Sequence, residues 1–232
     1  TIMASIPLIR RAALKHRSDI IRGSTSATDE MKRYYRAFYQ DIRSDFEELA
    51  KEIDALDGVP TSSQIFRLDR YKALMARTEE ELAKFGDKAN AIIDDRRITL
   101  AESAQGNARM LARIGMGLGP EGRGGASWKV LDSDAIENLI GQTGRKSPLY
   151  PILKELVPNG VDKVKGALIN GIIAGKSPSM IGRELKDDLA GNLGRFITIA
   201  QTEEMRAYRT SQTEAYRLND DILEGWRWNT AT

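Results

Sequence analysis

The sequence predicts a mainly α-helical fold: a long antiparallel helical hairpin, followed by a small C-terminal helical module of truncated α+β type. Apolar residues recur every three or four positions over 35–56 and 68–92, the period of an amphipathic helix. The segment 115–125 holds six glycines and a proline, which favours a connector between two parts. With 232 residues, 41% of them apolar and 29% charged, the chain can bury a core.

Composition excludes several classes of protein. There is no cysteine and one histidine, His16, so disulfide scaffolds, thiol nucleophiles and cysteine-ligated metal centres are absent from this sequence. A net charge of +2 is too small to coat duplex DNA, so any DNA contact should be local. No apolar run approaches the roughly 18 residues of a membrane span, and the apolar segment 2–9 precedes its basic residues, the reverse of a secretory signal. We expect a soluble intracellular protein, and we expect this sequence to be a fragment of a longer gene product that continues beyond Thr232.

Residues 1–27 are expected to form a basic N-terminal arm. The serine- and threonine-rich stretch 23–28 shows no helical period, which is typical of an irregular segment. The cations that precede it have two interpretations, a solvated helix face or a surface that meets phosphate or an acidic protein. The candidate contact residues are Arg10, Arg11, Lys15 and Arg17.

Residues 28–114 are predicted to form the long helical hairpin. Thr28, followed by two acidic residues, is the expected N-cap of the first helix. Residues 57–60 (Asp-Gly-Val-Pro) break that helix, and Thr61 with Gln64 forms a capping box for the next one. The second helix is expected to continue to the end of the range. Candidate breaks within it are Gly86 and Gly106.

Residues 115–127 are predicted to be a glycine-rich linker, and 128–232 to be the C-terminal module. A segment so rich in glycine is expected to form neither a helix nor a strand. Within the module, Asp132 is the expected cap of its first helix. The expected elements are helices at 132–140, 149–156, 161–173, 178–189 and 194–218, then a strand at 226–230.

Candidate nucleotide loops and nucleophiles do not assemble into a catalytic site. The glycines of 115–119 follow a helix, whereas a dinucleotide-binding loop follows a strand. Residues 175–177 (Gly-Lys-Ser) are similar to the end of a phosphate-binding loop, but Asn170 stands where that loop needs glycine and Pro178 follows. We therefore predict no catalytic residue, no metal ligand and no cofactor.

A polar pair, Thr202 and Glu203, lies within an otherwise apolar-faced helix. Arg206 follows Glu203 by one helical turn. The pair has two interpretations: a surface ion pair of a few tenths of a kcal/mol, or a buried Glu203 whose desolvation Arg206 and backbone donors offset. Neither interpretation implies catalysis.

Residues 165–232 resemble the phage head morphogenesis family, the minor capsid proteins related to protein F of phage Mu and to the minor head protein of phage SPP1. The segment 171–185 is similar to the family's glycine turn, polar cap and short helix ending Arg-x-Leu. The segment 199–207 is similar to the family's Ile-Ala-Arg-Thr-Glu-x-x-x-Ala helix. The segment 225–230 is similar to the strand that follows, where the family places a tryptophan.

The same comparison identifies four structural motif residues and two departures. Gln201 replaces the family's arginine beside the Thr-Glu pair, and the chain ends before the family's Asp-x-Arg-Thr motif. A metal or toxin module of the kind that some members carry is therefore not expected. The motif residues are Thr202, Glu203, Arg206 and Trp226.

The resemblance implies a structural minor capsid protein of a tailed phage, without enzymatic activity. It would bind the portal protein inside the head, near the portal, after assembly in the host cytoplasm. Further partners implied are the major capsid or scaffolding protein and packaged DNA, with no membrane in the assembled head. Two alternatives remain open: a metal-dependent nucleic-acid-processing enzyme with clustered carboxylates, and a coiled-coil scaffold unrelated to phage that self-associates through the seam 68–92.

Overall fold

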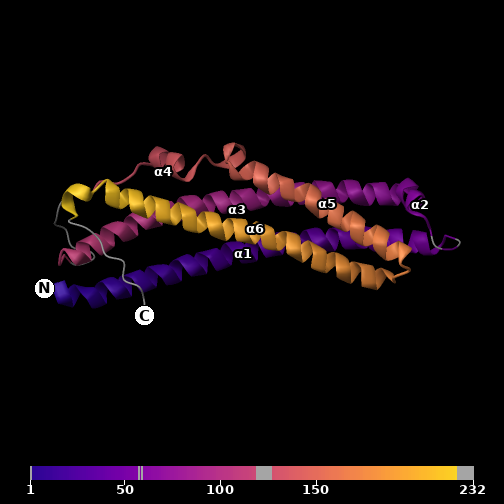
Figure 1. Cartoon of the computed structure of the whole chain (residues 1–232), viewed down its shortest axis with the longest axis horizontal. Helices are drawn as coiled ribbons and strands as arrows, with labels where there is room; N and C mark the ends of the chain where they lie inside the picture. Colours follow the sequence, from indigo (N-terminus) through magenta and orange to yellow (C-terminus); the bar gives the residue numbers. More distant parts are fainter. Residues whose placement is uncertain (1, 57, 59, 119–126, 224–232) are drawn as a thin grey trace. The chain divides into compact units, whose positions relative to one another are not determined.

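The computed structural model describes residues 2–56, 58, 60–118 and 127–223, and its regular secondary structure is helical throughout these ranges (Figure 1). The mainly α prediction is confirmed there. The centre of the predicted linker, 119–126, and the predicted strand lie outside the described residues. The helices are α1 (Ile2–Asp54), α2 (Ser62–Arg67), α3 (Asp69–Gly115), α4 (Ser133–Ile140), α5 (Leu149–Ile173) and α6 (Pro178–Arg217), with 3-10 turns at Gly144–Lys146 and Asp220–Ile222.

The chain divides into two compact units, each assembled from segments that are distant in the sequence. Unit 1 comprises Thr1–Ala27, Ile93–Thr143 and Gln201–Thr232. Unit 2 comprises Thr28–Ile92 and Gly144–Ala200. The three longest helices, α1, α3 and α6, therefore each contribute one part to each unit.

In unit 2, α1 and α3 form the predicted antiparallel hairpin. Ion pairs join Glu30 to Lys88 and Asp45 to Arg77, so residue numbers rise along one helix as they fall along the other. Phe85 of α3 packs edge-on against one ring of α1 and one of α6, each at a centroid distance of 4.8 Å. With α5, these segments form the apolar helical bundle of unit 2.

The turn of the hairpin carries the predicted capping box. The Thr61 side chain accepts from the Gln64 amide, and the Gln64 side chain accepts from the Thr61 amide. The helix that follows is short, because Leu68 adopts extended backbone angles and α3 begins only at Asp69. Neither Gly86 nor Gly106 breaks α3, which continues to Gly115.

The predicted start of the first helix at Thr28 is wrong. The α1 helix already begins at Ile2 and runs through the serine- and threonine-rich stretch 23–28 without a break. Small residues there allow close packing: Gly23 lies under the Arg96 side chain, Ser24 hydrogen-bonds Glu204, and Ala27 is buried. Tertiary contacts thus outweigh the poor helix propensity of this stretch.

The shorter C-terminal helices predicted from the sequence are in fact joined. Asp132 caps α4 as predicted. In α5 the helix continues through Pro158, and in α6 it continues through Gly194. Gly160 lets α5 and α6 approach closely, since a Cβ there would meet the Asn192 side chain at 2.5 Å.

The two units differ in what they bury. Unit 2 has a core of large apolar side chains, whereas the core of unit 1 is rich in alanine and buried polar groups. Among the described residues, no helix has the length and apolarity of a membrane span. The buried polar and charged residues of unit 1 are Asp94, Arg97, Gln105, Asn107, Glu204, Ser211 and Asn219.

Candidate partner-binding site

A buried ion cluster occupies unit 1 and is built around Arg97 of α3. The Arg97 side chain is fully buried and donates to Asp94 Oδ1 at 2.9 Å and to the carbonyl of Ile140 at the end of α4. Its Nε lies 3.9 Å from Glu203 Oε2 on α6. One guanidinium therefore links three helices, and the geometry of its planar fork suits this role better than that of a lysine.

Glu204 forms the second half of the cluster. Its side chain is 3% exposed, and its Oε1 lies 3.8 Å from Arg96 Nε. Burial raises the pKa of Glu204, while the Ser24 hydroxyl and the Arg96 guanidinium act in the opposite direction. The carboxylate is thus held by groups from α1 and α3, which fixes α6 against both helices within unit 1.

The structure places the predicted Thr-Glu motif at the edge of this cluster. Glu203 is mostly buried, with 13% of its side chain exposed, and pairs with Arg97 and, at 3.3 Å, with Arg206. Arg206 and Thr202 are exposed. Both interpretations of the pair are therefore partly right, because Glu203 is desolvated while Arg206 remains a surface partner. Trp226 lies outside the described residues.

Sequence reasoning missed Glu204 and Arg97, the most deeply buried ions of the cluster. The signal for Glu204 was present: it continues the three-and-four spacing of Phe196, Ala200 and Ala207 along the buried face of α6. Asp94 lies only three residues before Arg97, but the other two partners described, the Ile140 carbonyl and Glu203, lie 43 and 106 residues away and leave no signal in the sequence.

The chemistry of this cluster is structural. Its carboxylates face guanidinium groups, and no group of three metal-ligating side chains occurs in the described parts of the chain. Buried ion pairs of this kind specify the packing of helices rather than a reaction.

The four predicted contact residues, Arg10, Arg11, Lys15 and Arg17, all lie exposed on α1 in unit 1. Arg10 and Arg17 share one face with the exposed aliphatic residues Leu14 and Ile21, which are 53% and 55% exposed, at spacings of four, three and four. Arg11 and Lys15 lie on the adjoining face. No ion pair joins any of the four cations to another described residue. We call this surface, residues 10–22 facing solvent, the outer face of α1.

The opposite face of α1 belongs to the core of unit 1. His16 stacks on Tyr208 at a centroid distance of 5.4 Å, and Ile20 packs against Leu100, Ala104 and Tyr208. Burial lowers the pKa of His16, and the Asp19 carboxylate acts in the opposite direction. The core thus fixes the rotation of α1, so the basic and aliphatic side chains of the outer face must point to solvent.

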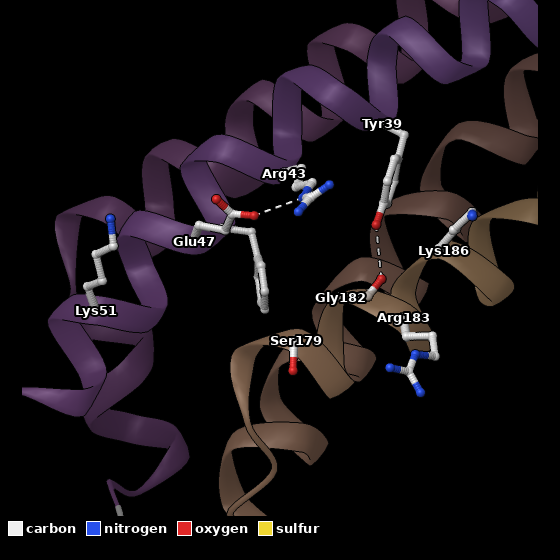
Figure 2. Close-up of a pocket in the computed structure, with 9 residues that line it drawn as sticks. Tyr39, Arg43, Glu47, Lys51, Ser179, Gly182, Arg183 and Lys186 are labelled. Atoms are coloured by element: carbon white, nitrogen blue, oxygen red, sulfur yellow. Dashed lines mark hydrogen bonds and ion pairs between the residues drawn. The ribbon is translucent and has the colours of Figure 1, made fainter.

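A concave surface lies within unit 2, between the C-terminal part of α1 and the start of α6 (Figure 2). The pocket has a volume of about 480 Å³. Tyr39 closes one side by donating from its hydroxyl to the carbonyl of Gly182 at 3.1 Å. Its lining residues are Tyr39, Arg43, Phe46, Glu47, Lys51, Ser179, Gly182, Arg183 and Lys186.

The seam 68–92, proposed as a self-association surface, is largely occupied inside unit 2. Tyr71, Leu82, Phe85, Ala89 and Ile92 are all buried in the chain's own bundle. That seam therefore presents little apolar surface to a second copy.

Comparison of the chain with protein-family models, with curated proteins and with solved structures finds no match.

Proposed function

We propose that this chain is a structural minor capsid protein of a tailed-phage head and that it binds the portal protein through the outer face of α1. The observation that carries the proposal is the combination of unpaired cations with exposed Leu14 and Ile21 on one helix face. Exposed aliphatic side chains among cations are typical of a protein interface, where apolar anchors are surrounded by a polar rim.

Charge supports an acidic protein as the partner in this proposal. The segment 10–22 carries five cations, and its one acid, Asp19, pairs with Arg22 at 3.6 Å. If the partner were duplex DNA, the cations would contact its phosphates, and Leu14 and Ile21 would remain exposed to water. An acidic protein surface with apolar side chains would satisfy both parts of the face.

The phage assignment rests on the resemblance of residues 165–232. The position of Glu203 in the buried ion cluster supports a structural role for the motif, because a pair that fixes helices needs no reaction to explain it. In this proposal the protein lies inside the head near the portal and acts through binding, without catalysis.

A portal-capture experiment tests the proposal. The double variants R10E/R17E and L14S/I21S should each weaken capture of the purified portal by about tenfold or more, the equivalent of about 1.4 kcal/mol. The control is R109E, an exposed cation of α3 in the same unit. Mass spectrometry of purified virions should also detect the protein. Absence from virions together with no portal capture would defeat the proposal.

A further inference from the structure

The pocket of unit 2 has an apolar floor that a missing side chain keeps open. Gly182 of α6 and the largely buried ring of Phe46 on α1 line this floor, and Figure 2 labels Gly182. A Cβ on Gly182 would lie 3.9 Å from Phe46 Cε1, an ordinary contact, so any longer side chain at this position would project into the pocket. The glycine therefore leaves room for an apolar group from another molecule.

The rim of the same pocket carries an excess of positive charge. It holds four cations and one carboxylate, and Arg43 Nε already donates to Glu47 at 2.8 Å. Lys51, Arg183 and Lys186 are exposed and form no ion pair with another described residue. By contrast, their cationic neighbours are paired: Arg70 with Glu48 and Glu52, Arg77 with Asp45, and Lys176 with Glu184.

We propose that this pocket binds an acidic peptide segment of a partner protein, with one apolar side chain seated beside Gly182 and carboxylates paired with Lys51, Arg183 and Lys186. A volume of about 480 Å³ is within the range of roughly 300–1,000 Å³ for sites that enclose a compact ligand. Charge complementarity selects an acidic partner, and the apolar floor selects a peptide side chain.

Nucleic acid fits this pocket less well. A phosphate backbone would pair with the rim and leave the apolar floor unfilled. An acidic peptide uses the floor and the rim together.

Fluorescence anisotropy with the full chain tests this inference. The probe is a labelled decapeptide of glutamates with a central Leu-Leu pair, and the reference probes are the same peptide with Ser-Ser in the centre and a single-stranded DNA decamer. The wild-type chain should bind the Leu-Leu peptide measurably below 1 mM and at least about fivefold more tightly than either reference probe, with an affinity that falls as salt screens the rim.

Three variants assign the binding to the pocket. R183E/K186E removes the rim charge and Gly182→Leu fills the floor, so each should weaken peptide binding by about tenfold or more. R195E is the matched control, because Arg195 is exposed on α6 two and a half turns after Lys186 and therefore on the opposite side of the helix, and it should change affinity less than about twofold. Circular dichroism should show that each variant retains its helix.

Failure to bind the peptide up to 1 mM, an equal loss in R195E, or a DNA decamer that binds as tightly with the same sensitivity to R183E/K186E would overturn the inference. The outcome is independent of portal capture, since all the variants lie in unit 2 and the outer face of α1 lies in unit 1.

Discussion

Gly23 of α1 lies directly under the guanidinium of Arg96 on α3: a Cβ built on this glycine would stand 2.7 Å from Arg96 Cζ. The position is helical, with small or hydroxyl-bearing neighbours, where the sequence pattern gave no sign of a helix. Because Gly23 has no side chain, the Arg96 guanidinium has the space it needs to reach Glu204 in the ion cluster.

Gly23→Ala should destabilise unit 1 even though alanine is the better helix former. Alanine gains about 1 kcal/mol of helix propensity, but its methyl displaces Arg96 from the buried Glu204 carboxylate. We expect a net loss of about 1 kcal/mol in the free energy of unfolding, measured in urea. Gly106→Ala is the control, since nothing lies near a Cβ there, and it should stabilise by about 0.5–1 kcal/mol. Equal gains at both glycines would contradict the packing described for Gly23.

Arg97→Met should cost far more stability than Arg206→Met. Removing the buried guanidinium takes away the Arg97 ion pairs of Asp94 and Glu203 and the donor of the Ile140 carbonyl, which costs about 3–5 kcal/mol. Arg206 is exposed, so its loss should cost less than about 1 kcal/mol. Urea unfolding of the two variants measures both losses in the free energy of unfolding. Comparable losses would show that Arg97 does not organise the cluster.

Acidification should destabilise the fold in part through His16. Burial lowers the pKa of His16 in the folded state below its usual 6.5, so the unfolded chain binds the proton more readily. The free energy of unfolding should therefore fall as the pH drops from 7 through 6.5 and towards the folded-state pKa. His16→Phe keeps a ring against Tyr208 but cannot titrate.

Comparing the wild type with His16→Phe isolates the contribution of histidine titration, because His16 is the only histidine in the sequence. Thermal melts at pH 7 and pH 5 should show a larger decrease in Tm for the wild type than for His16→Phe. Identical decreases would place the pH dependence in the carboxylates.

Periodicity was sufficient to predict the hairpin and its turn. The spacing of apolar residues predicted α3, and the Thr61 and Gln64 pair predicted the capping box, because both signals are local in sequence. Asp132 was likewise predictable as a cap. Such features depend on residues that lie within one or two helical turns of one another.

Long-range packing accounts for what the sequence did not reveal. The N-terminal part of α1 is helical because Gly23, Ser24 and Ala27 fit against α3 and α6, and α5 and α6 approach closely where Gly160 leaves room for the Asn192 side chain. The contacts of Arg97 with the Ile140 carbonyl and with Glu203 could not be predicted for the same reason, because these partners are distant in the sequence. Of the predicted contact residues, the sequence identified the cations but not the helix that aligns them with Leu14 and Ile21.

Site-specific photo-crosslinking tests the central claim, that the outer face of α1 contacts the portal. A benzoylphenylalanine placed at Leu14 and activated by light during phage assembly should crosslink the protein to the portal, whereas the same group at the exposed Arg109 should not. A portal crosslink from position 14 alone is the predicted result. No portal crosslink from position 14, or equal crosslinking from both positions, would contradict the account.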